Sequence, residues 1–580
     1  VLADAGDSQP WRHSRLRWLD STIGSDDQPV APFTPLVLEG TTIRCLGRDV
    51  QLEATGLPGC IRSYFTPEVT LLVAEGRPLL AGPMRFVAEL PDGTVSAFSG
   101  GRVEFLKRTA GHVVWRSTSR LGPLRMSCQG DMEFDGHLTF TMQLTAERAT
   151  AVNDLRLEIP LRGDVARYLM GMGRPGGLRP AEHTWRWDRK NNQDSIWLGD
   201  VNAGLRCQLF GEKYRRPLIN IHYRHLPLNL PPAWHNEGRG GCSVREEPDG
   251  RVVLRATSGS RTVAPDQPLH FNFALLVTPL KPLDTDGHWA SRYYHAYHSP
   301  DQVVQAGANV VNIHHGNDIN PYINYPFLRV DKLKQYVDEA HTKGLKVKIY
   351  YTTREVSNRS VELFALRSLG DEVVVPGPGG GHTWLQEHLD PPYVPGWHTP
   401  GVRDVAFITT PDSRWHNYYL EGLDWLIRNV GIDGLYIDDV AYDRRVMQRA
   451  RKILDRSRPG AEIDLHSWNH FNDRAGHACC LNLYMEHLPY IDRVWIGEGR
   501  DYNTPPDYWL IEISGIPFGV MGEMLQGGGN PWRGMVYGMT SRLPYMADPR
   551  PIWKVWDEFG MQGSRMIGYW VPDCPVRTDH

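Results

Sequence analysis

Two patterns of apolar and polar positions divide this chain. From about residue 35 to 280, short runs alternate apolar and polar side chains, most clearly His137–Leu144 (HLTFTMQL). A period of two is typical of a strand buried on one face. Asp-Gly pairs at 92–93, 135–136 and 249–250 are typical of hairpin turns. The pattern predicts an N-terminal antiparallel β-sandwich with further strands at Thr42–Cys45, Val103–Lys107, Val113–Ser117, Leu155–Pro160, Val252–Ala256 and Leu269–Val277.

After a linker at Thr278–Pro282, apolar runs alternate with helical patterns to the end of the chain. Strand followed by helix, repeated over this length, predicts a parallel sheet closed into a (β/α)8 TIM-type barrel. The doubly wound alternative lacks a G-x-G-x-x-G motif after the first strand. We therefore expect a sandwich domain at 1–280, with an extended lead-in at 1–30, and a catalytic barrel at 283–580.

The expected elements of the barrel follow from these runs. Strands are predicted at 309–314, 346–351, 434–437, 462–466, 493–496, 518–521 and 566–570, and helices at 330–343, 361–369, 413–429 and 444–457. Gly370–Asp412 interrupts the alternation with a Gly/Pro-rich run at 376–381, and 503–506 and 526–531 are also rich in Gly and Pro. Such insertions usually extend one rim of a barrel and shape its pocket, and Trp384 is expected to help close it.

Composition narrows the class of protein. The 580 residues carry a net charge of -4, which argues against a nucleic-acid or anionic-membrane partner. No run of about 18 apolar residues is present, so no membrane span is expected. The 19 tryptophans include a share suited to stacking on sugar rings. Eight cysteines form no C-x-x-C pair, and the redox compartment and oligomeric state stay open. The chain begins at Val1 without a signal peptide; if an upstream segment is removed, we expect a secreted or periplasmic protein rather than a cytoplasmic one.

Polar side chains gather where the predicted strands of the barrel end. Because the carboxyl ends of the strands share one face of a barrel, these residues are expected to form one site. A lone aspartate after a strand is more often a helix cap, and a lone histidine a core residue, but five strand ends of this kind argue for a shared purpose. The residues are His314, His315 and Asn317; Tyr350 and Arg354; Asp438 and Asp439; His466, Trp468 and Asn469; and Glu498 and Arg500.

The carboxylates among them are the groups that glycosidic cleavage needs, one to protonate the leaving oxygen and one to attack or stabilise the sugar cation. In one arrangement Asp438 or Asp439 is the nucleophile and Glu498 the acid. In the other, one aspartate orients the 2-acetamido group of the substrate and its neighbour is the acid. Adjacent strand residues point to opposite faces, so both aspartates reach one pocket only if the strand ends between them. Asp438 is the strongest candidate.

Other chemistries have less support. No G-x-S-x-G, H-E-x-x-H or P-loop motif is present, and the histidines lack a metal-ligand spacing, so no metal and no cofactor are predicted. The partner expected is an oligosaccharide or polysaccharide. Two rivals remain open, a polysaccharide lyase with a Tyr or His base and a carbohydrate-binding protein without catalysis. The remaining candidates, Arg354 and Arg500 included, are assigned to sugar hydroxyls and ring faces. The two arginines also hint at an anionic group on the substrate.

Three segments resemble bacterial glycoside-hydrolase-like proteins related to glycoside hydrolase family 123. They are Trp18–Gly24 (WLDSTIG), Asp433–Arg444 (DGLYIDDVAYDR), and Pro506–Trp509 (PDYW) followed by Gly515–Gly519 (GIPFG). The resemblance implies an N-terminal β-sandwich, a (β/α)8 barrel and exo-acting β-N-acetylgalactosaminidase activity assisted by the substrate acetamido group. The family's catalytic pair is Asp-Glu, whereas the matching place here holds Asp438-Asp439, which leaves room for Glu498 as the acid.

Overall fold

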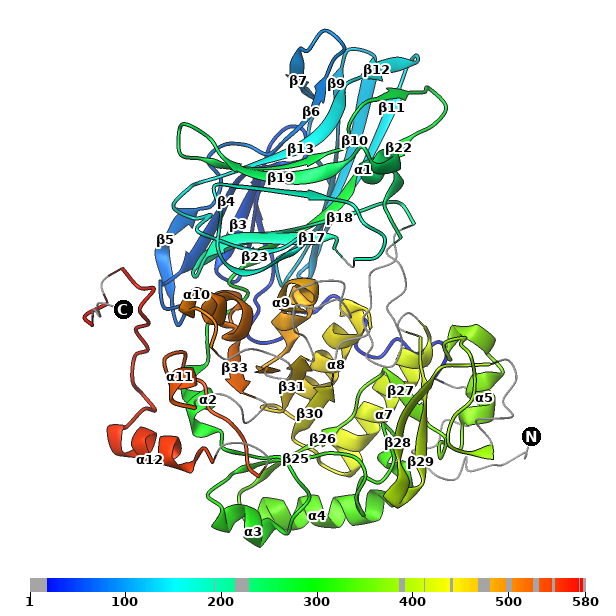
Figure 1. The fold of residues 1–580 in the computed structure, drawn as a ribbon, viewed down its shortest axis with the longest axis vertical. Helices are drawn as coiled ribbons and strands as arrows, with labels where there is room; N and C mark the ends of the chain where they lie inside the picture. Colours follow the sequence, from blue (N-terminus) through cyan, green and yellow to red (C-terminus); the bar gives the residue numbers. More distant parts are fainter. Residues whose placement is uncertain are drawn as a thin grey trace.

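The computed structural model describes residues 18–191, 193–213, 229–384, 392–410, 413–438, 442–467, 480–496, 503–524, 531–544, 548–572 and 574–576. Antiparallel sheets built from the first half of the chain lie against a parallel sheet and its helices from the second half (Figure 1). None of the helices in these ranges is long and apolar enough to cross a membrane.

The antiparallel part confirms the strands expected from the alternating pattern. Among the described residues its largest sheet runs in the order β15-β14-β17-β18-β23-β11-β10-β9-β8, with β22 beside β11, and a second runs β16-β19-β20-β13-β6-β7. The bounds in the first are β8 Glu104–Arg108, β9 His112–Leu121, β10 Leu124–Glu133, β11 His137–Ala146, β14 Tyr168–Gly171, β15 Arg174–Leu178, β17 Ser195–Asp200, β18 Ala203–Phe210, β22 Leu269–His270 and β23 Asn272–Thr278. Those in the second are β6 Arg85–Glu89, β7 Val95–Ala97, β13 Asp154–Leu161, β16 Glu182–Arg186, β19 Gly241–Glu246 and β20 Val252–Thr257.

Smaller elements complete this part. A five-stranded sheet, in the described residues, runs from β1 to β5, and β12 pairs with β21. Their bounds are β1 Val37–Glu39, β2 Thr42–Cys45, β3 Arg48–Leu52, β4 Pro58–Phe65, β5 Leu72–Pro78, β12 Thr150–Val152 and β21 Arg261–Val263, with the short helix α1 at Pro232–His235.

Alternating burial explains why these strands pair as they do. In β11, the apolar side chains Leu138, Phe140 and Met142 are buried, and they share a core with Leu157 and Leu254 of the second sheet. Each Asp-Gly pair joins neighbouring antiparallel strands, and Gly93, Gly136 and Gly250 there have φ of 83°, 82° and 81°. Positive φ is a conformation that glycine adopts without steric cost, so the predicted hairpins are confirmed.

The second half contains one curled parallel sheet in the order β24-β25-β26-β30-β31-β32-β33. Its strands are β24 Tyr293–Tyr294, β25 Val310–Ile313, β26 Lys346–Tyr350, β30 Gly434–Asp438, β31 Glu462–Ser467, β32 Arg493–Ile496 and β33 Met521–Met524. Leu543 forms a single parallel bridge to Tyr294 at the free edge of β24. The described residues thus supply seven strands and one bridge rather than a complete ring, and closure into (β/α)8 stays a prediction.

Helices follow or precede these strands as the 3.6-residue pattern predicts. They are α2 Thr285–Ala290, α3 Pro300–Gln305, α4 Val330–Thr342, α5 Leu363–Arg367, α7 Trp415–Asn429, α8 Arg444–Ser457, α9 Cys480–Leu483, α10 Pro506–Tyr508, α11 Pro531–Met535 and α12 Arg550–Phe559. In α8 the residues Val446, Ala450, Ile453 and Leu454 form the buried stripe. The side chain of Asp443 caps α8 by accepting a hydrogen bond from the Arg445 amide.

The structure corrects three sequence-based expectations. Residues 518–521 are not a strand, because Gly515 and Gly519 with positive φ enclose a 3-10 turn at Ile516–Phe518, and β33 begins only at Met521. Residues 566–570 form no strand: Trp570 is buried instead by stacking on Tyr537. The insertion at 370–412 is more than a loop.

This insertion carries a small sheet of its own. Its strands β28 Pro395–Thr399 and β29 Asp404–Ile408 pair with each other, and β29 pairs with β27 Glu355–Ser357 just beyond β26. Val405 and Phe407 in β29 are fully buried, so apolar burial orders a segment that its glycine content had assigned to a flexible rim.

The two halves of the chain share an extensive interface. Strands β17, β18 and β23 lie between the remaining antiparallel strands and the parallel half (Figure 1). The Arg206 side chain in β18 forms a buried ion pair with Glu486 at 3.3 Å, and Asn482 in α9 donates to the carbonyl of Ser195 at 3.0 Å. Both faces of β23 are therefore buried, which explains its unbroken apolar run.

Candidate active site

Asp438 and His466 meet because their strands are paired in register. Asp438 is the last residue of β30, and the parallel ladder places it opposite His466 in β31. Paired residues of neighbouring strands point to the same face, so the two side chains touch, with 2.6 Å between His466 Nδ1 and Asp438 Oδ1. The imidazole therefore lies against one oxygen of the carboxylate.

The other oxygen of Asp438 is held by two residues from the end of β26. Arg354 Nη2 donates to Asp438 Oδ2 at 2.9 Å, and the Tyr350 hydroxyl donates to the same oxygen at 3.2 Å. Arg354 also donates to the Tyr350 hydroxyl at 3.3 Å, which ties the three groups together. Arg354 is 1% exposed, whereas the Asp438 side chain keeps 13% of its surface accessible. A ligand can thus reach the carboxylate but not the guanidinium that holds it.

These contacts fix the protonation state of Asp438. Burial by itself raises the pKa of the carboxyl, but the positive charge of Arg354 and the contact with His466 outweigh it and hold the pKa well below its ordinary value. Asp438 is therefore an anion near neutral pH. Such a group can attack or stabilise a developing positive charge or accept a hydrogen bond, and it is a poor proton donor.

Two neutral imidazole rings lie beside the carboxylate of Asp438. The rings of His314 and His315, directly after β25, lie 4.4 and 4.8 Å from the ring of Tyr350, centre to centre. Burial lowers the pKa of His314 to about 4 and that of His315 well below its ordinary value. Both rings are neutral near pH 7. Nδ1 of His314 donates to the carbonyl of His315 at 3.4 Å, which leaves its Nε2 as an acceptor for a sugar hydroxyl.

The Asn317 side chain is hydrogen-bonded within the turn that follows β25. Its amide nitrogen donates to the carbonyl of His314 at 2.7 Å, and its amide oxygen accepts from the backbone of Ile319 and Asn320 at 3.1 and 2.9 Å. The side chain thus closes the turn that positions His314.

Arg354 is buried and its guanidinium binds Asp438. Trp384 lies in the insertion with 71% of its surface exposed. Asp439, Trp468, Asn469, Glu498 and Arg500 lie outside the described residues. The structure therefore brings together Asp438, His466, Tyr350, Arg354, His314 and His315.

Three further residues belong to this cluster and were missed in the sequence. The guanidinium of Arg542 donates to His295 Nδ1 at 2.8 Å and to the Tyr436 hydroxyl at 3.2 Å. Because arginine only donates, His295 Nδ1 is the acceptor and its neutral ring carries the proton on Nε2. Tyr436 could have been predicted from the sequence, since it lies two residues before Asp438 on the same strand face. His295 and Arg542 could not have been predicted in this way, because they are brought together only by the bridge between Tyr294 and Leu543.

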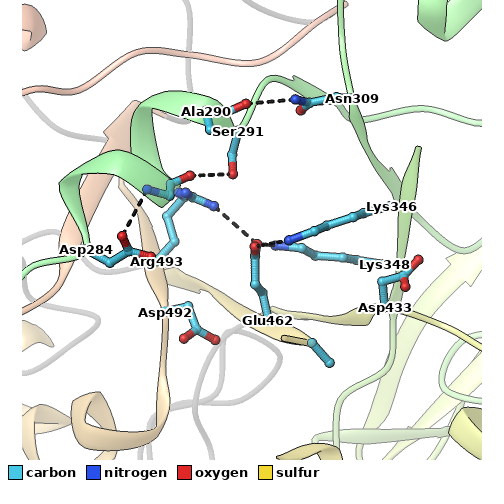
Figure 2. A network of polar contacts seen from close by, with 12 residues as sticks. Asp284, Ala290, Ser291, Asn309, Lys346, Lys348, Asp433, Glu462, Asp492 and Arg493 are labelled. Atoms are coloured by element: carbon cyan, nitrogen blue, oxygen red, sulfur yellow. Dashed lines mark hydrogen bonds and ion pairs between the residues drawn. The ribbon is translucent and has the colours of Figure 1, made fainter. Parts of the chain in front are cut away.

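Beneath this cluster the inside of the parallel sheet is charged. Lys348 in β26 binds both acidic residues of β31, with 2.5 Å to Glu462 Oε2 and 3.0 Å to Asp464 Oδ1. Arg493 in β32 lies 3.6 Å from the same Glu462 oxygen, and Lys346 binds its other oxygen at 2.8 Å. Figure 2 shows the two lysines of β26 and the arginine of β32 pointing toward Glu462 of β31. These residues precede Tyr350 and His466 at even spacing, so they face the same interior.

The lysines of this layer lower the pKa values of its two acidic residues to different extents. Burial alone raises the pKa of Glu462, but Lys348 and Lys346 bring it down to about 2. In Asp464 burial prevails over Lys348 and raises the pKa to about 6. Lys348 and Asp464 have no exposed surface, so removing the lysine leaves a fully buried carboxyl whose remaining counter-ion is Arg493 at 3.9 Å.

Replacing Lys348 by Met is therefore expected to lower the free energy of unfolding by about 3–5 kcal/mol, the usual effect of breaking a buried ion pair. Lys346→Met is the matched control, because Lys346 binds the same Glu462 with 46% of its side chain exposed and should contribute no more than about 1 kcal/mol. Urea unfolding of both variants measures the difference. Equal losses would show that burial does not govern this layer.

The described residues contain no group of three or more His, Cys, Asp or Glu side chains placed to hold a metal ion. 

Family models match along the chain. The model of the glycoside hydrolase 123 TIM-barrel domain matches residues 284–544, that of the third domain of glycoside hydrolase 123 matches 36–279, and that of its C-terminal domain matches 548–580. The protein is accordingly a glycosidase. It belongs to glycoside hydrolase family 123, as the sequence resemblance had indicated.

Similarity to individual proteins is weak. No curated protein matches the sequence. Among solved structures, the galactosidase domain of an alpha-galactosidase-sucrose kinase is 8% identical with a TM-score of 0.35, covering 91% of this chain and 85% of that one. An alpha-N-acetylgalactosaminidase from Bifidobacterium bifidum is 10% identical with a TM-score of 0.35 (89% and 92% covered). A cycloalternan-degrading enzyme from Trueperella pyogenes is 11% identical with a TM-score of 0.34 (82% and 77% covered).

Proposed function

We propose that this glycoside hydrolase cleaves a terminal N-acetylhexosaminide at the Asp438 cluster. The observation that carries the proposal is the ionised, accessible carboxylate of Asp438, held by Arg354, Tyr350 and His466 at the carboxyl ends of the parallel strands. Catalytic groups of barrel enzymes lie at that end. The family supports the class of sugar and the exo-action, and the neutral histidines beside Asp438 suit a substrate rich in hydroxyl groups.

The charge of Asp438 separates the two catalytic roles. A carboxylate that is ionised near neutral pH serves either as the nucleophile at the anomeric carbon or as the group that accepts a hydrogen bond from the acetamido N–H and orients it. The proton for the leaving oxygen must then come from a different group, and Asp439 and Glu498 are the candidates. We assign the acid to one of these two and the anion to Asp438.

Leaving-group chemistry identifies the acid. The leaving oxygen of a dinitrophenyl glycoside departs with little protonation. That of a methyl glycoside or a disaccharide must be protonated by the acid. Asp439→Asn and Glu498→Gln are to be compared on both substrates. For the variant that removes the acid, turnover of the disaccharide is expected to fall by about 10²–10⁴-fold with little change for the dinitrophenyl substrate. Equal losses on both substrates in both variants would contradict this division of roles.

The substrate class is tested with nitrophenyl α- and β-glycosides that include N-acetylhexosaminides. Release from the N-acetylhexosaminides, together with stepwise monosaccharide release from an oligosaccharide, is the expected result. Products with the ultraviolet absorption of an unsaturated uronide would instead reveal a lyase. Sugar binding that survives Asp438→Asn, with no turnover in either form, would reveal a binding protein without catalysis.

Two architectural proposals accompany this function. We propose that the linker at 278–282 divides the sandwich domain, 1–280, from the catalytic barrel, 283–580. We also propose that the segment around Leu543 supplies the closing strand of the barrel, a proposal supported by its bridge to Tyr294.

A further inference from the structure

A cavity of about 620 Å³ lies where the helices α7 and α8 begin. Helices of a (β/α) unit begin on the face where the strands end, so the cavity opens on the same face as Asp438. Its lining is rich in charge and includes Arg414, Arg445, Arg449, His416, Glu372 and Asp443. Nothing in the catalytic cluster uses these residues.

The charges of the lining do not cancel. Arg414 is neutralised by Glu372, whose two oxygens it binds at 2.7 and 2.8 Å. Arg449 instead donates to the backbone carbonyls of Ile23 and Ser21, at 2.7 and 3.0 Å, and to the amide oxygen of Asn417 at 2.7 Å, so its hydrogen bonds go to neutral groups, with the Glu421 carboxylate nearby. The Arg445 side chain is exposed and, within the described ranges, has no hydrogen bond or ion pair. Asp443 is occupied in capping α8.

His416 adds an unused polar atom to this lining. The residue is 7% exposed, and its Nε2 has no hydrogen-bond partner in the part of the chain that the structure describes. Burial, reinforced by the positive charge of Arg449, lowers the pKa of His416 to about 3, so the ring is neutral. A buried polar atom without a partner is uncommon in folded proteins and calls for a ligand or water.

Two connections link the cavity to the Asp438 cluster, one along the chain and one through a hydrogen bond. Asp443 follows Asp438 by five residues, which span at most about 18 Å when extended. On the other side, the Trp415 indole beside His416 donates to the carbonyl of Thr353 at 3.1 Å, directly before Arg354. The cavity and the Asp438 cluster thus lie on the same face, joined by a short stretch of chain and by this hydrogen bond.

We propose that this cavity binds the anionic group, carboxylate or sulfate, of a sugar residue neighbouring the bond that is cleaved. Arg445 and Arg449 supply positive charge without bound carboxylates, the first turns of α7 and α8 add the positive ends of two helix dipoles, and neutral His416 supplies a hydrogen bond. The inference rests on the proposed function and specifies its substrate as an acidic glycan.

Calorimetric binding to the full chain carrying Asp438→Asn tests this without turnover. Three probes are compared: a neutral N-acetylhexosamine tetrasaccharide, a tetrasaccharide alternating N-acetylhexosamine with uronate, and its sulfated form. At least one acidic probe is expected to bind about tenfold more tightly than the neutral one, and to lose that advantage at high salt. The preferred acidic probe distinguishes carboxylate from sulfate.

Arg445→Gln is then added to this background. It is expected to weaken the acidic probe about tenfold, the effect of one charge-assisted hydrogen bond, and to leave the neutral probe unchanged. Arg428→Gln is the matched control, because Arg428 is an exposed arginine at the opposite end of α7. Equal affinity for neutral and acidic probes, or equal effects of the two arginine substitutions, would overturn the proposal. Acidic preference in a protein that hydrolyses no glycoside would overturn the proposed function alone.

Discussion

Turnover is expected to fall by about 10²–10⁴-fold or more when Asp438 is replaced by Asn, because the substitution removes the anion on which the reaction depends. Asn keeps the shape of the side chain and an oxygen that accepts from Arg354 and Tyr350. It cannot attack an anomeric carbon or stabilise a positive charge at it. Steady-state rates on the nitrophenyl glycoside that the wild type prefers measure the loss, and circular dichroism checks the fold.

Asp433→Asn is the matched control for this experiment. Asp433 directly precedes the same strand and is also buried, but it lies at the opposite end, where it pairs with Arg458 and His341. Its loss should affect stability and leave the rate constant for hydrolysis near that of the wild type. If Asp438→Asn kept its turnover, or Asp433→Asn lost as much, Asp438 would not be the catalytic carboxylate.

The second large effect is expected from Arg354→Gln, which acts on Asp438 through its pKa. Arg354 is the strongest influence that lowers this pKa against the effect of burial. Glutamine keeps an N–H donor but no charge, so the pKa of Asp438 should rise. The acid limb of kcat/KM against pH, measured on the free enzyme, should then move to higher pH, because Asp438 becomes protonated earlier on acidification.

The same substitution should weaken the fold. A carboxyl whose pKa is lower in the folded than in the unfolded chain stabilises the fold above its unfolded pKa, and the effect is lost as pH falls through the folded pKa. Without Arg354 this contribution shrinks at neutral pH. Urea unfolding at neutral and acidic pH measures it. Arg359→Gln is the control, since Arg359 donates to the carbonyl of Arg403 and lies over the ring of Tyr322, away from Asp438. An unmoved acid limb would show that Arg354 does not hold Asp438 ionised.

Local pattern was sufficient for most elements of the fold. The helix over 444–457 and the strand over 493–496 were predicted to the residue, since their periodicity and caps are properties of short segments. Predictions failed where burial came from distant contacts. In the apolar run 566–570, Trp570 is buried by stacking on Tyr537 and not by pairing in a sheet. The glycine-rich insertion is ordered by β27, which lies outside it.

For the candidate site, the sequence by itself determined which residues end the strands, and hence that Asp438, His466 and Tyr350 share one face. It did not determine what those residues do. The structure buries Arg354 against Asp438, and Asn317 closes a turn. His295 and Arg542 are 247 residues apart in the chain, and only the bridge that tertiary packing forms between Tyr294 and Leu543 joins them. Spacing along the chain sets the direction of each side chain, whereas its charge partners, and therefore its chemistry, depend on strands that neighbour it only after folding.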